Sequence, residues 1–85
     1  MKQFQYTIKD DLGIHARPAG LLVRLAIGFN STINISKHDR LVNLKKIFSL
    51  MSLNVKCGDT VTITADGNDE QSAINTLQKF FQQNL

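Results

Sequence analysis

The stretch GIHARPAG, residues 13–20, contains the side chains of this 85-residue chain that are best suited to chemistry. His15 offers a nucleophilic ring nitrogen, because an imidazole is largely neutral near pH 7. Arg17 offers a planar, permanently charged fork of N–H donors that suits phosphate oxygens. Both residues stand at the start of a predicted helix, so we expect their side chains to lie near one helix N-terminus.

The start of that helix is itself suited to an anion, because its first turn has N–H groups without helical partners and a positive partial charge. Pro18 is compatible with this turn, since its missing N–H would have had no partner. Pro18 therefore fixes the helix start and leaves the backbone N–H groups of Ala16 and Arg17 available to phosphate. Taken alone, His15 could be a cap and Arg17 a surface charge. Their combination predicts a site that accepts and holds a phosphoryl group on His15.

The spacing of apolar residues along the chain predicts the strands and helices that must position this site. Alternation of apolar and polar residues predicts strands at 3–8, 31–36, 41–43 and 60–65. Apolar stripes predict helices from Ala16 to about residue 28, at 45–53, and after a capping box of Asn68 and Gln71. Each strand has one apolar face. The order β-α-β-β-α-β-α therefore predicts an α+β fold, with a four-stranded antiparallel sheet and three helices on one face, in a single domain over 1–85.

The short segment at 45–53 has more apolar residues than one helix face can bury. Leu50 and Leu53 are the predicted core residues of this segment. Ile47, Phe48 and Met51 are predicted to form an exposed apolar patch, which is typical of a protein–protein contact. A buried Phe48 is the alternative.

Three cations and one glycine complete the predicted docking surface. The chain has a net charge of +3. We hypothesise that Arg24, Lys45 and Lys46 steer acidic partners toward the histidine, the alternative being ordinary solvated charges. Gly20 stands inside the first helix, where alanine is more stable by about 1 kcal/mol. It either lets a partner approach closely or has no role.

Composition argues against several other classes of protein. Cys57 is the only cysteine, so no intramolecular disulfide can form, which fits a reducing compartment. No apolar run is long enough for membrane insertion, and we expect a cytoplasmic protein. Few aromatic residues are available to stack bases, which argues against nucleic acid. His15, His38 and Cys57 match no metal-ligand spacing, so neither a metal nor another cofactor is expected.

The segments GIHARPAG, VNLKKIFSLMSLNV and TVTITADGNDEQSAI together resemble HPr, the histidine-containing phosphocarrier family of the bacterial phosphoenolpyruvate-dependent sugar phosphotransferase system. The resemblance runs over nearly the whole chain and implies an open-faced β-sandwich. It implies that His15 is phosphorylated on Nδ1, receives the group from phospho-enzyme I and passes it to IIA domains of sugar permeases. It also implies that Arg17 stabilises the phosphate and that partners dock on the first two helices. We expect a monomeric carrier rather than a turnover enzyme.

One position departs from the Gram-positive members of that family. Their regulatory serine, at the start of the second helix, is replaced here by Lys46, which cannot accept a phosphate ester. Ser49 and Ser52 lie nearby but do not occupy that position. The alternative function is therefore an HPr-like regulatory protein, in a specialised or nitrogen-related branch of the system, that acts by binding partners.

Overall fold

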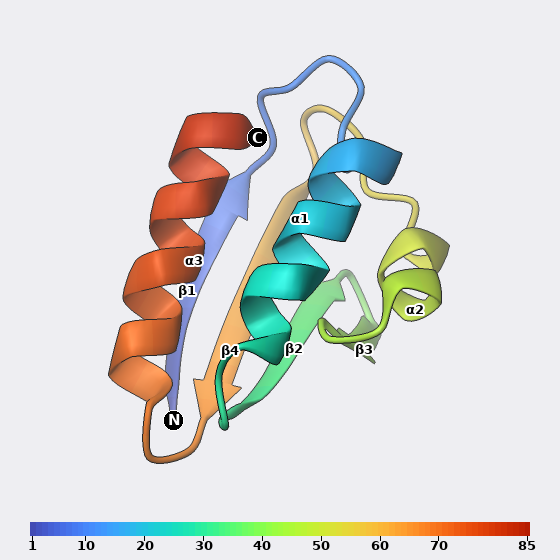
Figure 1. Ribbon diagram of the computed structural model, residues 1–85. Helices are drawn as coiled ribbons and strands as arrows, with labels where there is room; N and C mark the ends of the chain where they lie inside the picture. Colours follow the sequence, from blue (N-terminus) through green and yellow to red (C-terminus); the bar gives the residue numbers. More distant parts are fainter.

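The computed structural model describes residues 1–85 and has seven elements in the predicted order (Figure 1). The strands are β1 (Lys2–Thr7), β2 (Thr32–Lys37), β3 (Arg40–Asn43) and β4 (Thr60–Asp66). The helices are α1 (Ala16–Ile27), α2 (Ile47–Ser52) and α3 (Glu70–Asn84). The largest difference from the predicted bounds is α2, which is shorter at both ends. None of the three helices combines the length and apolar composition needed to cross a bilayer.

The four strands form one antiparallel sheet in the order β1-β4-β2-β3. At the centre of the sheet, Ile63 of β4 lies opposite Phe4 of β1 on one side and Ile35 of β2 on the other. All three side chains are buried, whereas the alternating threonines of β4 face the open side. The alternation in the sequence thus predicted which face of β1, β2 and β4 is covered.

The helices cover one face of the sheet, as predicted. Figure 1 shows α1 and α3 side by side across it, with α2 next to α1 and near β3. Phe81 of α3 is fully buried, and its ring meets Phe4 and Tyr6 edge-on at centroid distances of 5.6 and 5.5 Å. Such pairs add to the hydrophobic stabilisation that burial alone supplies. The tail of α3 is thereby fixed against β1, which places its last turn beside the start of α1.

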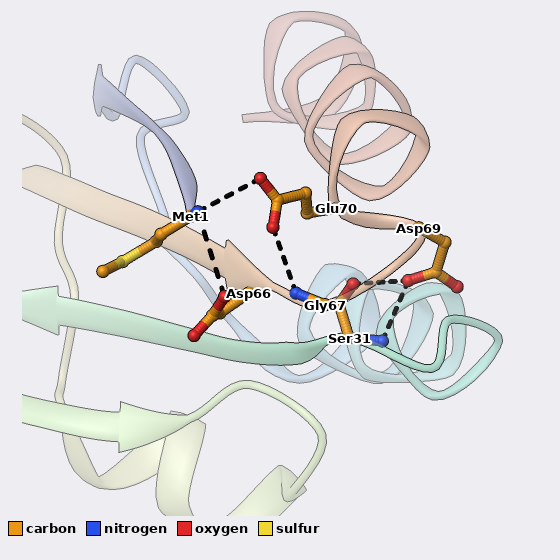
Figure 2. A network of polar contacts seen from close by, with 6 residues as sticks. All are labelled: Met1, Ser31, Asp66, Gly67, Asp69 and Glu70. Carbon is orange, nitrogen blue, oxygen red and sulfur yellow. Dashed lines mark hydrogen bonds and ion pairs between the residues drawn. The ribbon is translucent and has the colours of Figure 1, made fainter.

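The start of α3 corrects the predicted capping box. The helix begins at Glu70, and its N-cap is Asp69, whose side chain makes no cap hydrogen bond. The Asp69 carboxylate instead accepts hydrogen bonds from the backbone N–H and hydroxyl of Ser31 (Figure 2) and from the backbone N–H of Asn30. Glu70 accepts the N–H of Gly67 at 3.1 Å. A contact with a distant loop therefore defines this helix start, which local spacing could not predict.

This network lies beside an ion pair of the N-terminus. The Met1 ammonium lies 3.1 Å from a Glu70 oxygen and 3.8 Å from Asp66 (Figure 2). The hydrogen bond from Gly67 is the main cause that lowers the pKa of Glu70, and the ammonium adds to it. The hydrogen bond from Ser31 is likewise the main cause that lowers the pKa of Asp69. Both carboxylates thus favour the folded state while they are ionised.

We expect Ser31→Ala to lower the free energy of unfolding at pH 7 by about 1 kcal/mol, because it removes a buried donor from Asp69. Since the folded pKa of Asp69 lies below its unfolded value, this stabilisation is complete above about pH 5. It decreases as the pH falls through the lowered pKa. Urea unfolding of the wild type and of Ser31→Ala, measured between pH 7 and pH 2, should therefore show that their free energies of unfolding converge in acid. A gap that stays constant with pH would contradict the assignment.

Candidate functional site

His15 is the N-cap residue of α1. Its backbone is extended, at φ −91° and ψ −180°, and its side chain makes no cap hydrogen bond. Its carbonyl accepts the first helical bond, from the N–H of Ala19 at 3.0 Å. The helical bond fixes the backbone of His15. The side chain is 37% exposed, so the ring is accessible to a partner. The structure therefore places the imidazole where the sequence predicted it.

The first turn of α1 contributes donors and no acidic side chain. Helix geometry leaves the N–H groups of Ala16 and Arg17 without helical partners, and Pro18 has none to satisfy. Pro18 is buried, whereas Arg17 is exposed and takes part in none of the ion pairs of the chain. Two backbone donors and one uncommitted guanidinium therefore lie beside His15.

These residues surround a shallow hollow of about 270 Å³. It is lined by His15, Arg17, Pro18, Leu21 and Asn84. Asn84, from the last turn of α3, was not predicted as a site residue. It is 69 positions from His15 in the chain and comes close only because α3 packs beside α1. No acidic side chain lines this hollow, and the Arg17 guanidinium gives it a positive charge that attracts an anion.

The segment before α1 is fixed by the loop at 54–58. Gly13 adopts a positive φ of 67°, and a Cβ at this position would collide with the backbone of Val55 and Lys56. Ile14 is buried and donates its N–H to the Val55 carbonyl at 3.1 Å. The backbone on the N-terminal side of His15 is therefore anchored, which limits how far the ring can move.

A carboxylate near the ring is a second residue that the sequence did not indicate. Oδ1 of Asp10 lies 4.0 Å from Nε2 of His15. The sequence presents Asp10 and Asp11 together in a loop, and nothing in their spacing indicates which of them faces the histidine.

The predicted docking residues divide into exposed and packed ones. Phe48 is 87% exposed and Met51 38%, which fits a patch for a partner. Ile47, also predicted to be exposed, is half-buried against the core, so that part of the prediction is wrong. Ile47 is the first residue of α2 and packs against the main core cluster. Gly20 is exposed, and no atom lies within 4 Å of the place where a Cβ would be.

The three predicted steering cations also divide. Arg24 and Lys46 are exposed. Lys45 is half-buried, and its ammonium donates to the Phe29 carbonyl at 2.7 Å, just beyond the end of α1. A cation there satisfies the negative end of the helix dipole. Lys45 therefore has a structural role, which removes it from the steering hypothesis. Asn43 binds the N–H of Lys45 at 2.8 Å and does not cap α2.

Lys45 and Lys46 should consequently respond differently to substitution. Lys46 is the N-cap of α2 and makes no cap bond, so Lys46→Ser should raise stability by about 1 kcal/mol. We also expect it to weaken the salt dependence of phosphoryl transfer, because a steering charge is lost. Lys45→Met should instead lower stability by about 1 kcal/mol. Thermal unfolding and transfer rates at 20 and 300 mM salt, between which the Debye length falls from about 20 Å to about 6 Å, test both. Equal behaviour of the two variants would contradict this division.

Fold and site define a class: a small protein with one open-faced antiparallel sheet and an accessible histidine at a helix N-terminus, beside an arginine. Residues 2–83 match the family described as "PTS HPr component phosphorylation site". The chain belongs to the HPr family.

Solved structures agree with this membership. HPr from Thermoanaerobacter tengcongensis is 41% identical, with 98% of this chain and 93% of that chain covered and a TM-score of 0.94. The histidine-containing phosphocarrier protein of Mycoplasma is 38% identical, with 96% and 93% covered and a TM-score of 0.94. Crh, the catabolite repression HPr of Bacillus subtilis, is 39% identical, with 100% and 98% covered and a TM-score of 0.78. Its structure is described as an intertwined, domain-swapped dimer. The relatives therefore include both a phosphocarrier and a catabolite repression protein.

Proposed function

We propose that this protein is the phosphocarrier of a phosphotransferase system, in which His15 accepts a phosphoryl group from phospho-enzyme I and passes it to IIA domains of sugar permeases. The observation that carries this proposal is the accessible imidazole at the start of α1, with the uncommitted Arg17 guanidinium beside it. The family supplies the reaction class, and these two side chains supply the groups that the reaction needs.

The arrangement suits a reversible transfer. The lone pair of one His15 nitrogen attacks phosphorus, and the bond from phosphorus to the donor breaks with its electron pair left on the donor. The N–H groups of Ala16 and Arg17 and the Arg17 guanidinium can bind the phosphoryl oxygens during this step. The protein thus contributes position and charge stabilisation, which is the main requirement of phosphoryl transfer.

Partners are proposed to dock on the surface that α1 and α2 form beside the histidine. Phe48 and Met51 supply exposed apolar area, and Arg24 and Lys46 supply positive charge. An acidic partner with an apolar centre would complement this surface. The proposed role places the carrier in the cytoplasm as a monomer. Light scattering tests the monomer directly, since Crh is described as a dimer.

A regulatory role is the second candidate, because Crh is as similar to this chain in sequence as the phosphocarrier of Mycoplasma is, at 39% and 38% identity. In that role the protein binds a partner and moves no phosphate to sugar. Lys46 removes the serine through which Gram-positive relatives are regulated, so such a role would need a different signal from theirs.

Incubation with enzyme I and phosphoenolpyruvate separates the two candidates. We expect an acid-labile mass gain of one phosphate that His15→Ala abolishes. His38→Ala is the matched control, because His38 is the only other histidine and lies in the exposed turn between β2 and β3. A chain that gains no phosphate would favour the regulatory candidate.

A further inference from the structure

We propose that Asp10 is a positioning residue for phosphoryl transfer: its carboxylate favours the proton on Nε2 of His15 and so leaves Nδ1 as the attacking nitrogen. The inference rests on the proposed function. Its basis is the placement of Oδ1 at 4.0 Å from Nε2, in a chain where no other acidic side chain is paired with that histidine. This separation is too long for a direct hydrogen bond and short enough for Coulomb attraction.

The Asp10 carboxylate is fixed in place by its own loop. Oδ1, the atom nearest His15, accepts the N–H of Leu12 at 2.9 Å. The backbone N–H of Asp10 donates to the Leu85 carbonyl at 2.8 Å, and its carbonyl accepts the N–H of Gly13 at 3.0 Å. Three hydrogen bonds thus hold this residue, and its side chain is only 33% exposed. A residue secured at its side chain, N–H and carbonyl presents its charge in one direction.

That direction has a chemical consequence. A neutral imidazole has one N–H and one lone pair, and the partner of one nitrogen decides which nitrogen is protonated. A carboxylate beside Nε2 stabilises the tautomer with the proton there. When the Nδ1 lone pair forms the bond to phosphorus and the donor leaves with its electron pair, no proton has to move. The ring gains positive charge and Nε2 keeps its proton. The Asp10 charge stabilises that developing cation.

The charges around the ring then have separate tasks. Arg17 and the helix N-terminus are proposed to bind the phosphoryl oxygens, and Asp10 lies beside Nε2 of the ring. With phosphorus on Nδ1, the Asp10 carboxylate lies beside the other ring nitrogen. The same logic orients histidines that bind metals or activate serine, where a carboxylate holds the ring nitrogen that does not react.

Asp10→Asn tests the charge and leaves the loop intact, because an asparagine oxygen can still accept the Leu12 N–H. We expect kcat for phosphorylation by enzyme I to fall about fivefold, the factor that corresponds to ~1 kcal/mol for charges 4 Å apart in water. KM should stay unchanged, since Asp10 lies outside the docking surface. The ¹⁵N shifts of the His15 ring should move toward a larger share of the Nδ1–H tautomer. Asp11→Asn is the matched control: Asp11 is adjacent and exposed, has no ion pair, and should match the wild type throughout.

Unchanged ring shifts in Asp10→Asn, or a fall in kcat that Asp11→Asn reproduces, would overturn the inference. An equal loss of melting temperature and kcat, without a change in ring shifts, would assign Asp10 a purely structural role and would overturn it as well. The NMR measurement needs no partner protein. If the wild type is never phosphorylated, the proposed function fails, and the ring shifts still decide whether Asp10 sets the tautomer.

Discussion

Arg17→Ala is expected to lower kcat for phosphorylation of His15 by about 100-fold, because it removes a charged donor from the place where phosphoryl charge must be bound. Arg17 is exposed and takes part in none of the ion pairs of the chain. Its loss should therefore leave the melting temperature nearly unchanged. Quenched-flow kinetics with excess enzyme I, followed by mass spectrometry of the phosphorylated chain, gives kcat without a contribution from docking.

Two further variants separate charge, geometry and docking. Arg17→Lys keeps the charge and loses the planar fork, so we expect about a tenfold loss of kcat, between the wild type and alanine. Arg24→Ala removes an exposed arginine farther along the same helix, and it should raise KM while kcat stays the same. An Arg17→Ala protein that reached the wild-type kcat would show that the backbone N–H groups alone bind the phosphoryl oxygens.

The fold was predictable because its signals are local. Each strand alternates, so the sequence indicates which residues of β4, such as Ile63, face the helices. The stripe of α1 indicates that Ala19 and Leu22 are buried, and both are. The place of β4 between β1 and β2 is different, because pairing of distant strands follows from no short segment. No strand order was predicted from the sequence, and the structure supplies it.

The site was predictable where its groups are consecutive and unpredictable where they meet in space. His15 and Arg17 lie in one motif, and helix geometry alone places both beside free N–H groups. Asp10 and Asn84 reach the same ring through loop closure and helix packing. For Lys45 the sequence predicted a role at the docking surface that the structure does not support. A lysine beside Lys46 suggests a free surface charge, but the Lys45 ammonium donates to the Phe29 carbonyl just beyond the end of α1.

Gly13→Ala is expected to lower the free energy of unfolding by about 3 kcal/mol, because it adds steric overlap to an unfavourable positive φ. A Cβ there would collide with the Val55 carbonyl oxygen and lie 2.7 Å from Cα of Lys56. Both are backbone atoms, which cannot turn aside as a flexible side chain can. At roughly 4–8 °C per kcal/mol, thermal unfolding should show a melting temperature lower by about 15 °C.

Gly20→Ala is the matched control for this prediction, because it makes the same chemical change seven residues further along the chain. It meets no atom within 4 Å and lies inside α1, so stability should rise by up to about 1 kcal/mol. The two substitutions should thus change the free energy of unfolding in opposite directions. Steric contact lowers it at Gly13, and helix propensity raises it at Gly20. Gly13→Ala should also slow phosphorylation, because the backbone that anchors His15 must shift with the loop at 54–58. A Gly13→Ala protein as stable as the wild type would mean that this loop yields freely and does not position the histidine.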